Sequence, residues 1–67
     1  MFFLFNRKIV NSNHIIKMWI EKTTKLQEYR LNIKMSDLEV LNEGFFKEIE
    51  AINRMNLIRD SLNFNDF

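Results

Sequence analysis

The chain has 67 residues, a formal net charge of +1 and 46% hydrophobic side chains, with no cysteine, no proline, one glycine and one histidine. The lack of cysteine excludes disulfides and thiolate metal sites, the lone His14 excludes a histidine-based metal cluster, and a single glycine excludes a glycine-rich phosphate loop. We therefore expect no metal and no cofactor. A chain this short buries only about 60% of the surface that it exposes when unfolded, so we expect one small domain that self-associates or binds a partner.

Residues 1–11 are expected to form an apolar and basic arm. Residues 2–5 are Phe-Phe-Leu-Phe, and Arg7 and Lys8 follow them. This apolar run is much shorter than the roughly 20 residues that span a bilayer, and its positive charge follows it, unlike that of a secretory signal. We therefore expect a cytoplasmic protein without a membrane partner. A helix start, a short strand and a disordered arm are all compatible with residues 1–11, and we expect an arm that packs on the rest of the chain.

The first long element is predicted as a helix over residues 12–33. Asn11, Ser12 and Asn13 are of the residue types that cap helix N-termini. Apolar side chains then recur at spacings of four and three, which is typical of one face of an amphipathic helix. The predicted contact face consists of Ile15, Trp19, Leu26, Tyr29 and Ile33.

A second helix is predicted over residues 36–62. The Ser-x-x-Glu spacing of residues 36–39 matches a capping box at its start. Gly44 lies inside the pattern and costs about 1 kcal/mol relative to alanine, and a break there would give a third helix over residues 37–43. Residues 63–67 are expected to form a frayed tail. The apolar positions of this helix are Leu38, Leu41, Phe45, Ile49, Ile52, Met55 and Leu62.

The two halves of the chain carry opposite charge. Residues 1–34 hold seven basic and two acidic side chains, a net charge of +5, and residues 35–67 hold three basic and seven acidic side chains, a net charge of −4. Opposite charge favours folding of one half onto the other, or head-to-tail pairing of two chains, although an exposed pair contributes only about 0–1 kcal/mol. The sequence therefore predicts an all-α fold, an antiparallel hairpin of two helices, or of three if the chain breaks at Gly44, that dimerises.

Several large apolar side chains fall outside the two predicted contact faces, and exposed apolar surface marks binding sites. We therefore expect a small intracellular regulatory protein that acts by binding another protein, or a second copy of itself. Interfaces carry aromatic and apolar anchors at their centre and polar residues at their rim. The expected anchors are Phe46, Leu57, Ile20, Phe2, Phe3 and Phe5, and the expected rim consists of Glu43, Lys47 and Glu50.

Nucleic acid is not expected as a partner. The basic residues of the first half share their predicted helix with Trp19 and Tyr29, but the spacing places both aromatic side chains in the contact face. The sequence pI of 8.1 is also lower than the value of about 9 that is typical of nucleic-acid-binding domains.

Eight residues around the predicted break carry a resemblance: Ile20, Glu21, Lys22, Met35, Ser36, Asp37, Val40 and Leu41. They resemble a family of small bacterial proteins, the short aspartyl-phosphate phosphatases that act on the sporulation response regulator. The resemblance extends from Ile20 to Ile52 and implies an antiparallel helical hairpin. It departs from the family at the signature Ser-Gln-Glu-Leu-Asp, where this chain has Lys-Glu-Ile-Glu over residues 47–50.

This resemblance implies an alternative function, the hydrolysis of phospho-aspartate on a response regulator. Glu48 or Glu50 would then lie near the acyl phosphate. Residues 34–37, 45–47 and 55–57 are also similar to pieces of the helical-hairpin inhibitors of the sporulation histidine kinase. Together these likenesses imply a bacterial two-component signalling protein as the partner, and they leave open whether the chain is an enzyme.

Overall fold

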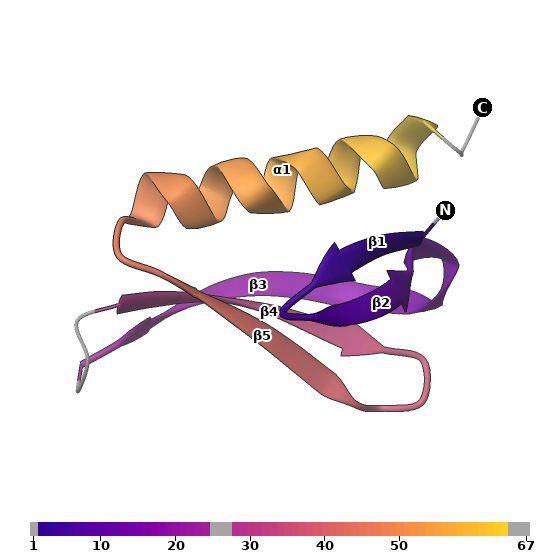
Figure 1. The fold of residues 1–67 in the computed structure, drawn as a ribbon, viewed down its shortest axis with the longest axis horizontal. Coiled ribbons are helices and arrows are strands. Elements are labelled where there is room, and N and C mark those ends of the chain that lie inside the picture. Colours follow the sequence, from indigo (N-terminus) through magenta and orange to yellow (C-terminus); the bar gives the residue numbers. More distant parts are fainter. Residues whose placement is uncertain (1, 25–27, 65–67) are drawn as a thin grey trace.

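The computed structural model of the protein describes residues 2–24 and 28–64, except for the side chains of residues 61–64. Within these ranges the chain forms two antiparallel sheets, a short 3-10 turn and one α-helix (Figure 1). One sheet is the hairpin β1–β2, and the other has the strand order β3-β4-β5. The elements are β1 (Phe2–Phe5), β2 (Lys8–Asn11), η1 (Ser12–His14), β3 (Ile15–Thr23), β4 (Glu28–Met35), β5 (Val40–Phe45) and α1 (Glu48–Phe64).

The prediction of an all-α helical hairpin is wrong, because more than half of the described residues lie in strands. Residues 12–33, predicted as the first helix, form η1, β3 and most of β4. Residues 36–62, predicted as the second helix, form the β4–β5 turn, β5 and most of α1. Residues 2–11 of the predicted arm form the hairpin β1–β2, which corresponds to the short strand among the alternatives. Leu26 and residues 65–67 of the predicted tail lie outside the described residues.

The ambiguity of short apolar spacings explains this error. Tyr29 and Ile33 are four residues apart, so they share a face both in a helix and in a strand. Leu31 and Met35 fill the alternate positions between and beyond them, which gives β4 the period of two that defines a strand facing a core. Leu31 and Ile33 are fully buried.

The predicted capping box at residues 36–39 is also wrong, because these residues form the turn between β4 and β5. The backbone N–H of Ser36 donates to the His14 carbonyl at 2.7 Å. The backbone N–H of Glu39 donates to the Asp37 carboxylate at 3.0 Å. Side chains that cap helices also stabilise turns, so the same residue types fit both structures.

Two turns hold residues in the left-handed region. Asn6 and Arg7, which connect β1 to β2, have φ of 46° and 67°, as expected at both central positions of a type I′ hairpin turn. Leu38 has φ of 72° in the β4–β5 turn, where the Leu38 N–H donates to the Met35 carbonyl at 2.8 Å.

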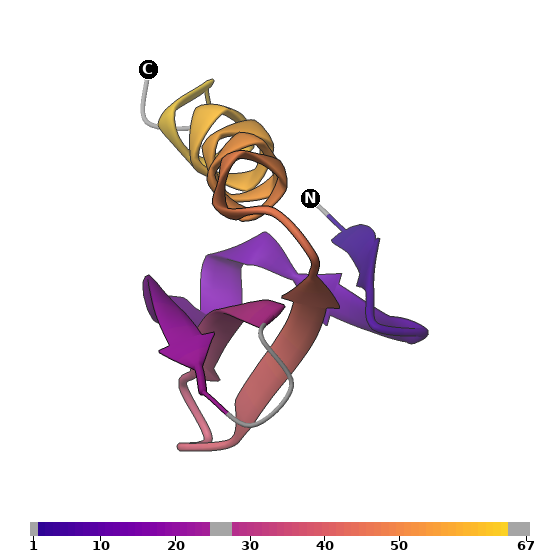
Figure 2. The ribbon, with the colours of Figure 1, turned by 90° about the vertical axis from the view of Figure 1, so that its left-hand side faces the viewer.

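The helix α1 and the hairpin β1–β2 pack against the same face of the three-stranded sheet (Figure 2). Alternate residues of β4 point to this face, and Ile58 reaches them from α1. No described element packs on the opposite face of the sheet (Figures 1 and 2). We call this opposite face the open face. The core consists of Phe5, Val10, Leu31, Ile33 and Ile58.

Arg54 links three elements at the edge of the core. Its Nε donates to the Glu43 carboxylate on β5 at 3.3 Å, and its Nη2 donates to the Leu4 carbonyl on β1. The other Glu43 carboxylate oxygen accepts from the backbone N–H of Asn6 at 3.0 Å. The guanidinium also lies 5.8 Å from the centroid of the Phe5 ring. This residue therefore fixes the position of the hairpin relative to α1 and β5.

Candidate functional site

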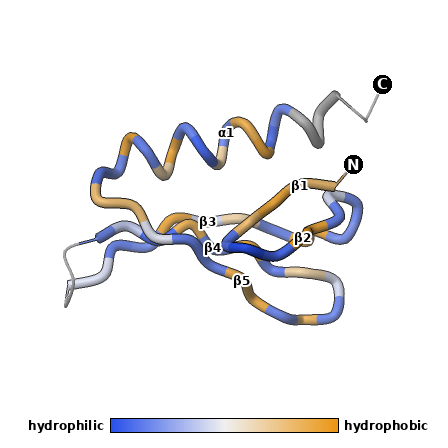
Figure 3. Tube along the Cα trace, in the orientation of Figure 1, coloured by the Kyte–Doolittle hydropathy of each residue, from blue (hydrophilic) through white to orange (hydrophobic). Residues whose placement is uncertain are grey.

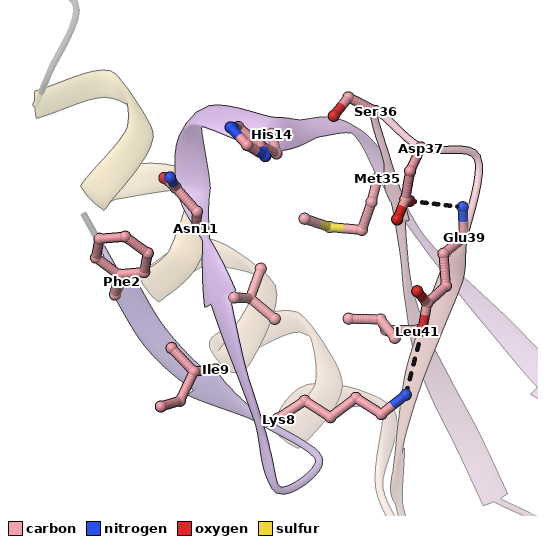
Figure 4. Close-up of a pocket in the computed structure, with 11 residues that line it drawn as sticks. Phe2, Lys8, Ile9, Asn11, His14, Met35, Ser36, Asp37, Glu39 and Leu41 are labelled. Atoms are coloured by element: carbon pink, nitrogen blue, oxygen red, sulfur yellow. Dashed lines mark hydrogen bonds and ion pairs between the residues drawn. The ribbon is translucent and has the colours of Figure 1, made fainter.

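A pocket opens between the two sheets, where the outer edge of β2 faces the β4–β5 hairpin (Figure 4). Its volume is about 310 Å³, near the lower end of the range for small-ligand pockets. Among the described residues no backbone hydrogen bond joins β2 to β5, so the two sheets remain separate here. The pocket is the gap that this separation leaves.

The floor of the pocket is apolar. Val10 is 2% exposed and belongs to the core, and the partly buried Met35 and Leu41 pack against the same core. All three side chains line the pocket, and Met35 and Leu41 point into it in Figure 4. A ligand group that enters the gap therefore meets the apolar interior of the protein.

The rim of the pocket is polar and is crossed by one ion pair. Lys8 on β2 and Glu39 before β5 form an ion pair of 3.2 Å (Figure 4). Both side chains are more than half exposed, so the pair contributes little to stability. Asn11, His14, Ser36 and Asp37 complete the rim. These groups offer hydrogen bonds of both kinds to a ligand at the mouth.

An apolar surface adjoins the mouth of the pocket. Leu4 is paired with Ile9 across β1 and β2, and Phe2 shares their face of the hairpin because side chains alternate along a strand. Their exposed fractions are 68% for Phe2, 62% for Leu4 and 78% for Ile9. Phe2 and Ile9 also line the pocket, and β1 is hydrophobic along most of its length (Figure 3). We call Phe2, Leu4 and Ile9 the hairpin patch.

A second hollow of about 430 Å³ lies near the end of β3. Its lining consists of the partly buried Thr23 and Tyr29 and the exposed Lys22, Thr24 and Phe46. Because no lining side chain reaches the core, this hollow offers a ligand less apolar contact than the pocket between the sheets.

The phenylalanines expected to anchor a partner occupy different environments. Phe2 lies in the hairpin patch, Phe3 is partly buried against the core, and Phe5 is fully buried within it. The rings of Phe3 and Phe5 pack edge to face, with centroids 6.4 Å apart. Of the three, only Phe2 is available to a partner without unfolding.

The other expected anchors do not form one surface with the hairpin patch. Phe46 is 85% exposed and lies between β5 and α1, and Leu57 is 64% exposed on α1. Ile20 on β3 is partly buried and packs against the core.

The acidic and basic residues expected at the rim or in catalysis lie near α1. Glu43 is held by Arg54, as described above. The Lys47 N–H donates to the Glu50 carboxylate at 3.2 Å, which caps the start of α1, and Glu48 is exposed in the first turn. Within the described residues no group of three or more His, Cys, Asp or Glu side chains is placed to bind a metal ion.

Sequence reasoning missed the residues of the pocket, chiefly Ile9, Val10, Met35 and Leu41. The sequence gives no alternating signal over residues 2–5 and 8–11, because residues 2–5 are uniformly apolar and Ile9 and Val10 are adjacent apolar residues; the exposed and buried faces of β1 and β2 are visible only in the structure. The predicted helix over residues 12–33 also gave no reason to expect that Met35 and Val10 line the same pocket.

The chain matches no known protein family, no curated protein and no solved structure. The resemblance to the aspartyl-phosphate phosphatases therefore stays a prediction, as does the formation of a dimer. In the part of the chain that the structure describes, no helix has the length and apolar character needed to cross a membrane.

Proposed function

We propose that this protein is a binding module that recognises a segment of another protein through the hairpin patch and the adjoining pocket. An apolar side chain of the partner enters the gap between β2 and β5 and contacts Val10, Met35 and Leu41. The partner's main chain then lies across Phe2 and Ile9. This function needs no metal, cofactor or catalytic group.

The observation that carries the proposal is the continuity between exposed and buried apolar surface. Phe2 and Ile9 are more than two-thirds exposed, and they line the same pocket as Val10, which is 2% exposed. Full burial of one aliphatic or aromatic side chain contributes about 1.5–3 kcal/mol. An apolar group of a partner therefore gains stabilisation both at the patch and inside the pocket.

The polar rim supplies orientation. Lys8 and Glu39 cross the mouth of the pocket as an exposed ion pair, and these charges can exchange their mutual contact for hydrogen bonds to the partner's backbone. A central apolar contact with a polar border is the usual composition of protein–protein interfaces.

Selection of peptides from a displayed random library against the immobilised protein tests this function. We expect enriched peptides that share one large apolar residue, with binding weakened at least tenfold by Ile9→Asp. This substitution places a charge in the patch, and since Ile9 is 78% exposed the fold should tolerate it.

The matched control is Ile16→Asp. Ile16 is also a largely exposed isoleucine, at 55%, but it lies in the bulge of β3, and it does not line the pocket. Equal loss of binding in both variants, or no enrichment of any peptide over background, would contradict the proposal.

A further inference from the structure

One end of the open face of the sheet β3-β4-β5 is basic, and the residues of this end take no part in the proposed binding function. Residues of β4 that point away from the core are Arg30, Asn32 and Lys34, because Leu31 and Ile33 between them are fully buried on the other side. The strand register places Lys17 opposite Lys34 and Trp19 opposite Asn32.

Lys17 and Lys34 form a cross-strand pair of like charge. Such pairs destabilise a sheet when the side chains lie directly opposite each other. Neither lysine forms an ion pair within the described part of the chain. The third residue of this row, Val40 on β5, carries no compensating charge. The sheet therefore keeps two uncompensated positive charges side by side on an uncovered surface.

An aromatic ring and two amides lie in the adjacent row. Trp19 is partly buried beside Asn32, which is only 6% exposed and is paired with the exposed Asn42 on β5. The Lys17 ammonium lies 4.9 Å from the centroid of the Trp19 ring. An anion that attracts Lys17 would draw this ammonium away and uncover the face of the ring.

The far end of the open face is already neutralised. Arg30 is paired with Glu28 at 3.2 Å along β4 and lies opposite Glu21 on β3. The Glu28 carboxylate extends toward Gly44, where an added Cβ would lie 3.1 Å from its Oε2. The positive charge that is available to a ligand is therefore concentrated at the end that holds Lys17 and Lys34.

We infer that the open face binds single-stranded nucleic acid. Adjacent phosphates occupy the lysine pair and relieve its repulsion, while an unpaired base stacks on Trp19 and an amide of Asn42 contacts the base edge. Stacking on aromatic side chains of a sheet, combined with basic contacts to the backbone, is an established mode of single-strand recognition. A duplex is excluded as the main ligand because its bases are already stacked on each other.

The placement of Trp19 removes one of the two sequence-based reasons against nucleic acid, the other being the sequence pI of 8.1. The removed reason assumed a helix in which Trp19 faces a partner helix, whereas in the structure Trp19 lies on the uncovered side of the sheet. The hairpin patch and its pocket are separate from this surface, so loss of one function leaves the other intact.

Titration of the Trp19 fluorescence with a 12-nucleotide oligo(dT) tests the inference, because Trp19 is the only tryptophan of the chain. We expect quenching at low salt. Each of Lys17→Gln and Lys34→Gln should weaken binding by roughly threefold to tenfold and lower the slope of log K against log salt by about 0.7. The matched control is Lys22→Gln, since Lys22 lies on the same strand but on the other face, 5.9 Å from the Tyr29 ring.

Three outcomes would overturn the inference. The first is the absence of quenching at 50 mM salt. The second is an equal loss of affinity in Lys22→Gln, which would indicate attraction by net charge alone. The third is equal quenching by heparin, a polyanion without bases, because it would exclude stacking as the cause of the signal.

Discussion

Arg7 holds a backbone conformation that suits glycine better. Its φ of 67° lies in the left-handed region, which costs a residue with a Cβ about 1–2 kcal/mol. Glycine avoids this strain but loses more conformational entropy on folding. The strain is therefore a local cost that the chain tolerates to close the two-residue turn between β1 and β2.

We expect Arg7→Gly to raise the free energy of unfolding by about 0.5–1 kcal/mol, measured by urea denaturation. Arg7→Ala is the control, because it removes the same charge and keeps the Cβ. An alanine variant as stable as the glycine variant would show that the charge, and not the backbone strain, is responsible.

Two ion pairs of this protein differ in their surroundings. Glu43 and Arg54 have side-chain exposures of 25% and 28% and connect β5, α1 and β1, whereas Lys8 and Glu39 have exposures of 62% and 52%. The first pair is partly shielded from water and carries additional hydrogen bonds to the backbone.

Arg54→Met is therefore expected to lower the free energy of unfolding by about 1.5–3 kcal/mol, since it leaves the Glu43 carboxylate without its charged partner. Lys8→Met should change it by less than about 1 kcal/mol. Thermal denaturation of both variants checks this difference, and equal losses would contradict the linking role of Arg54.

The helix α1 contributes to the core through one narrow stripe. Ala51 and Ile58 are buried, while the neighbouring Leu57 is 64% exposed. Ile58 packs in the cluster with Phe5, Leu31 and Ile33, and therefore joins the helix to both sheets.

Ile58→Ala should cost about 2–5 kcal/mol of unfolding free energy, which would leave a domain of this size largely unfolded. Leu57→Ala should cost less than about 1 kcal/mol, because little of its surface is buried. Circular dichroism during urea titration compares the two. A larger loss in Leu57→Ala would place the other face of α1 on the sheet.

At the scale of the whole molecule, the amino-acid composition supported only general predictions about the fold. The exclusion of disulfides and the expectation of one small domain follow from residue counts. The predicted helical contact face is wrong, because Trp19 lies on the open face whereas Tyr29 and Ile33 share the opposite face of the sheet. The second predicted helix overlaps α1, but its predicted start at residue 36 is twelve residues before α1 begins at Glu48.

The sheet itself was not predictable from the same spacings. Apolar residues four apart satisfy both periods, and the turn residues Ser36 and Asp37 are common in helix caps too. Pairing between strands depends on partners distant in sequence, such as Ile20 and Leu31, which no local pattern identifies. The pocket was missed for this reason, because it exists only where two separately formed sheets meet.

The pairing of Leu31 with Ile20 on one side and Glu43 on the other is the central structural claim, since the pocket and the open face both depend on it. Nuclear Overhauser contacts in a uniformly labelled sample test it most directly. We expect cross-strand backbone contacts between these pairs and extended-strand contacts over residues 15–23. A continuous series of helical contacts between residues i and i+3 over residues 15–23 would contradict the account.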